Sequence, residues 1–329
     1  MAGTFSVSDA VELAVVERSG FVESRHAGSA VVLGPDGEVA RSLGDVRSPV
    51  FPRSTLKPFQ AVASMTSGVT LRGEDAAIAT ASHSGTAAHV ALVRGLLARE
   101  RIPATALGCP LALPIDTAAR DQVIRSGGAK ERVYMECSGK HAAMLLACAA
   151  NDWPLEGYLA PEHPMQRKVL DVLERFTGER PAASGVDGCG APVHAVSLTG
   201  LARGIQKITT AQTSSPFALF REAAVLTEAA TEHPWAVGGP GRPDTIAMER
   251  LGVFAKIGAE GLMVMTAPNG TSTAVKVLDG SARATTIVAL RLLADAGALE
   301  HDAVDAVQAE LDLWIMGGDR PVGEIRATV

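Results

Sequence analysis

Aromatic side chains are scarce in this sequence of 329 residues, where Phe, Trp and Tyr together make up 4%. Hydrophobic residues still account for 47% of the chain and charged residues for only 20%. This balance excludes intrinsic disorder, and it leaves small and aliphatic side chains to fill the core. The length suits one large domain or two modest ones.

The sequence also lacks an excess of basic residues, since 36 Asp and Glu outnumber 30 Lys and Arg for a net charge of −6. This excludes the basic footprint of a nucleic-acid-binding protein. The longest apolar runs, such as residues 142–150, are far shorter than the roughly 20 residues of a membrane span. No basic segment precedes the first apolar residues, so a secretory signal is not expected. We therefore expect a cytoplasmic protein that binds neither nucleic acid nor membrane.

Cysteine is rare as well, with four thiols at Cys109, Cys137, Cys148 and Cys189. A disulfide framework is not expected in a large cytoplasmic chain, which leaves free, metal-bound and buried thiols as the options. Cys148 stands among Leu and Ala in a predicted helix and is expected in the core. Cys137 directly precedes that helix, and its thiol is expected to be acidified there.

Apolar spacing and turn residues predict strands at both ends of the chain and helices between them. The strands are expected at 11–17, 29–33, 38–43, 253–258, 262–265 and 273–277. The helices are expected at about 54–67, 86–99, 138–150, 161–176, 196–206, 215–232, 282–293 and 302–314. Residues 101–130 are expected to be irregular, and His26 is expected in a surface connection.

This order of elements predicts an α+β fold, with one antiparallel sheet formed by the N- and C-terminal strands and helices around it. We expect a single catalytic domain over residues 1–329, in which a helical region at about 54–250 is inserted between the two sheet-forming ends.

Ser54 stands three residues before Lys57, at the start of a predicted helix. Residues at this spacing share a helix face, about 5–6 Å apart at Cβ. A lysine at its ordinary pKa of about 10.4 is a poor base, but burial and a nearby cation lower that pKa until the amine can take a serine proton. Ser-x-x-Lys is the core of one class of acyl-transfer site. The pair alone is also compatible with a helix cap beside a solvent-exposed lysine.

Two further pieces follow in order, Ser82-x-Ser84 and Lys256-Ile257-Gly258. With Ser54-x-x-Lys57 they resemble the three-motif set of serine β-lactamases and penicillin-binding proteins. Longer motifs resemble the asparaginase II family, the thermolabile, rhizobial-type L-asparaginases, in order from about residue 14 to residue 280. These motifs are Arg53-Ser54-x-x-Lys57-Pro58, Ala81-Ser82-His83-Ser84, Cys137-Ser138-Gly139-Lys140-His141, Asp187-Gly188-Cys189, Gly241-Arg242 and Lys256-x-Gly258-Ala259.

The resemblance implies an amidohydrolase that converts L-asparagine to aspartate and ammonia, with a fold related to serine β-lactamases and glutaminases. It implies two Ser–Lys pairs, a bound zinc and a homodimer, and no organic cofactor is expected. The pairs are Ser54 with Lys57 and Ser82 with Lys256, and the zinc ligands are Cys137, Lys140 and Cys189. Three protein ligands leave one coordination position open, so the metal can be modulating rather than essential.

In this interpretation Ser54 attacks the side-chain amide with Lys57 as base. Ser82, partnered by Lys256, either relays a proton to the leaving ammonia or positions the substrate. The residues expected to contact the substrate are Arg53, His83, Asp187 and Arg242. Either arginine suits the substrate α-carboxylate as a bidentate partner.

Two alternatives stay open. A glutaminase or penicillin-recognising hydrolase would use the same serine and lysine residues, but those families lack the Cys137, Lys140 and Cys189 set. A zinc-dependent amino-acid-binding protein would keep the fold without turnover. The intact Ser–Lys pairs argue against that second alternative.

Overall fold

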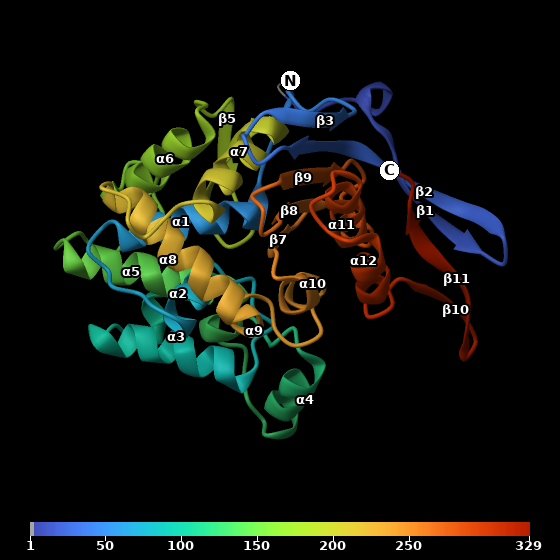
Figure 1. The fold of residues 1–329 in the computed structure, drawn as a ribbon. Coiled ribbons are helices and arrows are strands. Elements are labelled where there is room, and N and C mark those ends of the chain that lie inside the picture. The colour runs from blue at the N-terminus through green and yellow to red at the C-terminus, as the bar shows by residue number, and fades with distance from the viewer. Residues whose placement is uncertain (1–2) are drawn as a thin grey trace.

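The computed structural model describes residues 3–329. Its central element is an antiparallel sheet in the order β10-β11-β1-β2-β9-β8-β7, with β3 paired to β2 (Figure 1). The N-terminal strands β1 and β2 lie between two groups of C-terminal strands, which confirms the predicted α+β fold. The strands are β1 (Val11–Arg18), β2 (Phe21–Leu33), β3 (Val39–Leu43), β7 (Phe254–Gly258), β8 (Leu262–Thr266), β9 (Ser272–Val277), β10 (Trp314–Gly317) and β11 (Arg320–Ala327).

A second, three-stranded sheet joins β4 (Pro49–Val50), β6 (Pro192–Ser197) and β5 (Ala183–Val186) in that order. A short 3₁₀ helix, η2 (Arg53–Leu56), follows β4 directly. This small sheet therefore leads the chain into the segment that carries Ser54.

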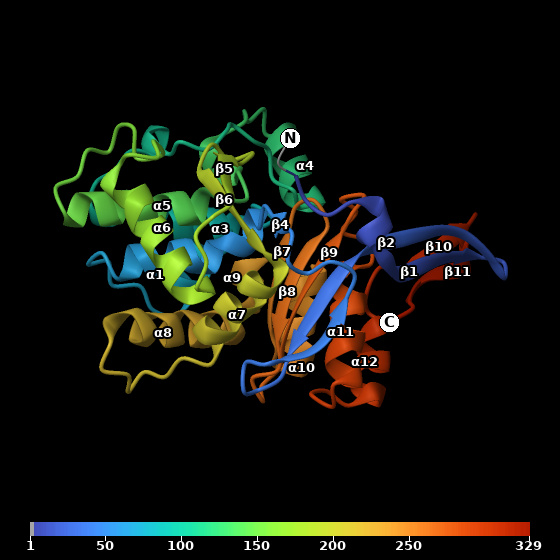
Figure 2. The ribbon, with the colours of Figure 1, turned by 90° about the horizontal axis from the view of Figure 1, so that it is seen from above.

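Helices fill the middle of the chain and lie mainly to one side of the large sheet, while α11 and α12 lie at its other side (Figure 2). The helices are α1 (Lys57–Met65), α2 (Glu74–Ala79), α3 (Ala87–Arg99), α4 (Thr117–Arg125), α5 (Ser138–Ala150), α6 (Pro164–Thr177), α7 (Leu198–Thr209), α8 (Ala218–Glu232), α9 (Pro234–Val237), α10 (Pro243–Leu251), α11 (Thr285–Asp295) and α12 (His301–Gln308). None of the helices within residues 3–329 is both long and apolar enough to cross a bilayer.

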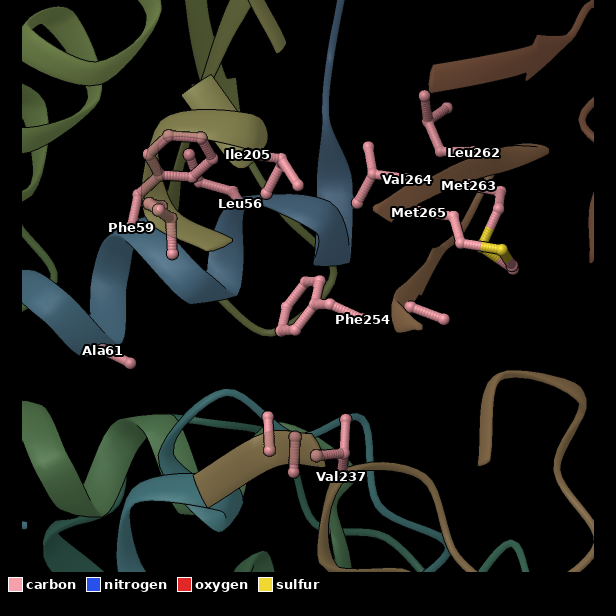
Figure 3. Packing of buried hydrophobic residues seen from close by; sticks show 14 of the residues in the cluster. Leu56, Phe59, Ala61, Ile205, Val237, Phe254, Leu262, Met263, Val264 and Met265 are labelled. Atoms are coloured by element: carbon pink, nitrogen blue, oxygen red, sulfur yellow. The ribbon is translucent and has the colours of Figure 1, made fainter. Parts of the chain in front are cut away.

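The start of α1 is fixed by its core side chains. Leu56 and Phe59 are at most 1% exposed. They point toward Ile205, with Phe254 and Val264 on the nearby strands (Figure 3). Full burial of one such side chain stabilises a fold by about 1.5–3 kcal/mol. This packing holds η2 against β7 and β8.

Several predictions about elements were wrong. Residues 117–125 form a helix, because the Asp116 side chain accepts a hydrogen bond from the amide of Ala119 at 2.7 Å and caps it. The strands β5 and β6 were not predicted. The chain ends in the hairpin β10–β11 rather than in a helix to residue 314, and β11 pairs with β1. His26 lies within β2, is 5% exposed and is 3.1 Å from Asp279.

Candidate active site

The two predicted lysines meet at one serine hydroxyl. Lys57 Nζ, from the first turn of α1, lies 2.7 Å from Ser82 Oγ, and Lys256 Nζ, from β7, lies 2.7 Å from the same oxygen. Lys57 also donates to the carbonyl of Ala81 at 2.6 Å, and Lys256 to that of Ile257 at 2.9 Å. Both lysines are fully buried and Ser82 is 3% exposed. The loop after α2 therefore brings Ser82 between two amines that are far apart in sequence.

Ser54 lies in η2, one helical turn before Lys57. The hydrogen bonds of Lys57 go to Ser82 and Ala81 rather than to Ser54. The two predicted Ser–Lys pairs are therefore not separate, because Lys57 and Lys256 both bond Ser82. We call Lys57, Ser82 and Lys256 the junction. It lies next to the segment that carries Ser54. Arg53 has a φ of 50°, a left-handed conformation that is uncommon for a non-glycine residue and that often marks functional sites. It turns the chain directly before Ser54.

The surroundings of Lys256 favour its neutral form. Burial is the main cause that lowers the pKa of Lys256 to about 7, and the nearby charge of Lys57 lowers it further. Asp244 and Glu136 act in the opposite direction. A substantial fraction of Lys256 is therefore a neutral amine near pH 7, as a general base or proton relay requires.

A second buried cluster contains Cys137, Lys140 and Cys189. Cys137 is the N-cap of α5, Lys140 follows it by three residues on α5, and Cys189 lies in the turn between β5 and β6. Each of the three residues is 2% exposed. The loop and the helix start thus place two thiols and one amine in one enclosed space.

The two thiols have opposite pKa shifts. The pKa of Cys189 is lowered, because its sulfur accepts a hydrogen bond from Cys137 and lies near the Lys140 ammonium. The pKa of Cys137 is raised, by that same hydrogen bond and by burial. Our prediction that the helix start acidifies Cys137 was therefore wrong, because the neighbouring thiolate outweighs the helix. Burial alone would lower the pKa of Lys140, but Cys189, Cys137 and Asp187 raise it.

The chemistry of these donors fits zinc. Thiolates are good zinc ligands, and an amine becomes one when it loses its proton beside a dication. His141 follows Lys140, and its Nε2 is buried without a hydrogen-bond partner while its Nδ1 lies 2.5 Å from the hydroxyl of Tyr158. Within residues 3–329 no group of three or more His, Cys, Asp or Glu is arranged to hold a metal. A metal here would depend on the Lys140 amine.

The four residues expected to contact the substrate have different environments. Arg53 Nε donates to Asp187 Oδ1 at 2.7 Å, so each of these side chains fixes the position of the other. Arg242 is the N-cap of α10, and its Nε is buried with no hydrogen-bond partner. Arg242 Nε is therefore a free, buried donor for an added carboxylate, whereas Arg53 Nε is already occupied.

His83 does not suit a substrate contact. It is fully buried, its Nδ1 accepts the amide of Gly85 at 3.1 Å, and its Nε2 therefore donates to Ser138 Oγ at 2.8 Å. Burial holds the pKa of His83 well below its ordinary value, so the ring stays neutral. His83 ties the Ser82 loop to the start of α5.

Asp244 is a site residue that we did not predict. Its carboxyl is fully buried, near Lys256 and 3.5 Å from the amide of Ile257. The sequence carried one signal for it, a carboxylate two residues after Arg242 in a Gly-rich loop. The Asp244 carboxylate raises the pKa of Lys256 and so opposes the effect of burial.

Gly139 allows α5 to pass against α2. A Cβ added at Gly139 would lie 2.1 Å from the carbonyl oxygen of Ile78. We expect Gly139→Ala to destabilise the fold by about 3 kcal/mol, the upper range for overpacking of a core, as measured by urea unfolding. Gly95→Ala is the matched control, because Gly95 lies in α3 with no atom within 4 Å of the added Cβ. It should stabilise by about 0.5–1 kcal/mol, and equal effects of the two changes would contradict the close approach at Ile78.

One known family matches almost the whole chain. The profile of the L-asparaginase II family matches residues 14–327. The chain belongs to the L-asparaginase II family. The match extends past residue 280, where the resemblance inferred from the sequence ends, and includes β10 and β11.

Solved structures similar to this L-asparaginase II chain include Mglu, a Bacillus glutaminase and a β-lactamase. The structure of Mglu in its native form is 12% identical, with 83% of this chain and 65% of that chain covered and a TM-score of 0.43. Bacillus glutaminase is 12% identical (82% and 91% covered, TM-score 0.44), and a β-lactamase from Mycobacterium bovis is 16% identical (87% and 95% covered, TM-score 0.41). The chain thus spans less than two thirds of the length of Mglu. A search of curated protein sequences found no match.

Proposed function

We propose that this protein hydrolyses L-asparagine to L-aspartate and ammonia, with Ser54 as the nucleophile. The observation that carries the proposal is the buried junction of Lys57, Ser82 and Lys256 beside η2, within a chain of the L-asparaginase II family. One amine near its neutral form and one shared hydroxyl supply the proton transfers that amide cleavage needs.

The first half of the reaction forms an acyl-enzyme. A proton first passes from Lys57 through Ser82 to the neutral amine of Lys256, which leaves Lys57 able to act as base. Ser54 Oγ then attacks the side-chain amide carbon and gives its proton to Lys57, and the amides at the start of η2 stabilise the oxyanion. Lys256 returns its proton through Ser82 to the amide nitrogen, the carbon–nitrogen bond breaks, and ammonia leaves.

The second half returns the enzyme to its starting state. A water molecule gives a proton to the Lys57–Ser82–Lys256 junction and attacks the ester carbon. The bond to Ser54 Oγ breaks, Ser54 regains its proton, and L-aspartate leaves. The same residues thus act as base in one half and as acid in the other, as microscopic reversibility requires.

We propose that Arg242 binds the substrate α-carboxylate and that Asp187 faces the α-ammonium. The unpartnered Nε of Arg242 and the commitment of Arg53 to Asp187 support this choice between the two arginines. We assign His83 no contact with the substrate, because it is fully buried and both of its ring nitrogens are hydrogen-bonded.

Replacing Arg242 with glutamine should weaken substrate binding. A hydrogen bond to a charged group contributes about 1.5–3 kcal/mol, so we expect kcat/KM for L-asparagine to fall by about 10- to 100-fold, mostly through KM. Steady-state kinetics measure this effect, with Arg125→Gln on α4 as a control that should leave both constants unchanged. A loss confined to kcat would contradict a ground-state contact with the carboxylate.

We also propose that Cys137, Lys140 and Cys189 hold a zinc ion that modulates the enzyme. Zinc bound there would supply a Lewis acid and a fixed positive charge near the Arg53–Asp187 pair. A metal that binds only the folded state raises its stability, by about 2.7 kcal/mol at a hundredfold excess over Kd. Zinc should therefore raise the melting temperature of the wild-type protein and leave that of Cys189→Ser unchanged.

A coupled ammonia assay with L-asparagine and L-glutamine, with and without zinc, tests the proposed reaction. Ammonia from L-asparagine is the expected result. Release from L-glutamine alone would favour a glutaminase, and a stable penicillin adduct by intact mass would favour a penicillin-recognising hydrolase. A rise in melting temperature with L-asparagine and no ammonia would favour an amino-acid-binding protein. The predicted homodimer and cytoplasmic location stay predictions, and light scattering tests the first of them.

A further inference from the structure

A pocket of about 290 Å³ lies beside Arg53, on the side of the small sheet. Its walls are mostly apolar and include Val50 and Phe51, at the end of β4 and just after it, and Ala183 and Ala195 of β5 and β6. Three charged side chains line it as well, namely Arg53, Glu260 and Lys276. The pocket is therefore apolar in its body and charged at one end. The residues of the Lys57–Ser82–Lys256 junction do not line it.

Lys276 is the buried cation of this pocket, with 8% of its surface exposed. Its Nζ donates to the carbonyls of Glu260 and Val277, each at 2.7 Å. An ammonium carries three hydrogens, so one donor is left over. Within residues 3–329 no carboxylate lies within 4.0 Å of Lys276 Nζ. A buried cation without an anionic partner is unfavourable and favours an anionic ligand.

Arg53 provides the second cation. Its Nε is committed to Asp187, and its Nη1 lies 3.7 Å from Glu260 Oε1, which is too long for a hydrogen bond. Glu260 has 64% of its side chain exposed, so it can turn to solvent at little cost. The terminal nitrogens of Arg53 therefore keep donor capacity toward the pocket.

These features select one class of ligand. A neutral apolar molecule would leave the Lys276 donor unpaired, and a polyanion would leave the apolar walls uncovered. L-Asparagine is polar along its whole length and suits the walls poorly. The volume equals that of about ten water molecules at about 30 Å³ each. We propose that the pocket binds a small carboxylate with an apolar body, whose carboxyl group meets Lys276 and Arg53.

The proposal does not rest on the proposed reaction, because the pocket and the junction share no residue. Isothermal titration of the full chain with 3-phenylpropanoate tests it, and 3-phenylpropan-1-ol is the matched neutral probe. We expect submillimolar binding of the acid and binding of the alcohol weaker by about tenfold or more, the factor that a charged hydrogen bond contributes. Equal affinity for both probes, or no binding of the acid at millimolar concentration, would overturn the proposal.

Two variants locate the binding site. Lys276→Met should weaken binding of the acid by about tenfold or more, whereas Lys207→Met, the same change on an exposed face of α7, should not. Ala183→Leu, in the short edge strand β5, should abolish binding because it fills the pocket. Ser54→Ala should bind the acid as the wild type does. Competition between 3-phenylpropanoate and L-asparagine in the Ser54→Ala protein would place the acid in the active site and would also overturn the proposal.

Discussion

Replacing Ser54 with alanine is expected to lower kcat/KM for L-asparagine by about 10⁴-fold or more, the loss that follows removal of an acyl-transfer nucleophile. The physical reason is that no other hydroxyl in η2 can replace it, since Thr55 donates its hydroxyl to the carbonyl of Pro52 at 2.6 Å. The coupled ammonia assay measures the loss. Ser64→Ala is the matched control, because Ser64 lies in α1 and its hydroxyl bonds only the carbonyl of Gln60, at 3.1 Å.

The same experiment separates the two serines. Ser82→Ala should also reduce turnover, because Lys57 and Lys256 lose their shared partner, but the nucleophile remains. An acyl-enzyme should therefore accumulate or form slowly in Ser82→Ala, as seen by intact mass, and should be absent in Ser54→Ala. Near-normal activity in Ser54→Ala, together with an adduct on Ser82, would transfer the nucleophilic role to Ser82.

Replacing Lys256 with arginine is expected to lower kcat/KM by about 10²- to 10⁴-fold, the usual contribution of a general acid–base group. Arginine keeps the positive charge and can bond Ser82, but it does not lose its proton at accessible pH. The change therefore removes the neutral amine while it keeps the cation. Lys207→Arg on the exposed face of α7 should leave the rate unchanged.

The pH profile gives Lys256 a signature of its own. Because burial and Lys57 lower the pKa of Lys256 to about 7, the neutral amine increases as the pH rises through that value. The wild-type kcat/KM should thus rise through about pH 7 and then level off, and Lys256→Arg should lose this rise. The apparent pKa belongs to the coupled junction rather than to one lysine. A wild-type rate that falls as the pH rises through about 7 would contradict a neutral Lys256 as the active form.

The sequence predicts which residues gather at the site better than how they pair. The motifs around Ser54, Ser82 and Lys256 are each short and local, so they can be recognised without a structure. The bond from Lys57 to Ser82 depends on how the loop after α2 packs against α1, which no local pattern encodes. The same holds for Cys137, whose protonation is decided by Cys189, a residue on a different loop.

The sequence likewise predicts some elements of the fold and misses others. The strands at 11–43 and 253–277 carry short apolar runs bounded by clear hairpin turns, so the sequence predicts them well. The short strands β5, β6, β10 and β11 gain their stability from partners that are distant in sequence, and local propensity is a weak guide to such pairing. The helix α4 is missed because it has no buried residue and therefore no apolar stripe.

The pairing of β2 with β9 brings Val31 opposite Ala274. During synthesis on the ribosome, the first three strands emerge long before any residue of β7, β8 or β9. Until those strands arrive, the edge of β2 has unpaired backbone groups, which is a template for association with other nascent chains. The helical region must therefore collapse around an unfinished sheet, and chaperones that shield open strand edges should raise the yield of active protein.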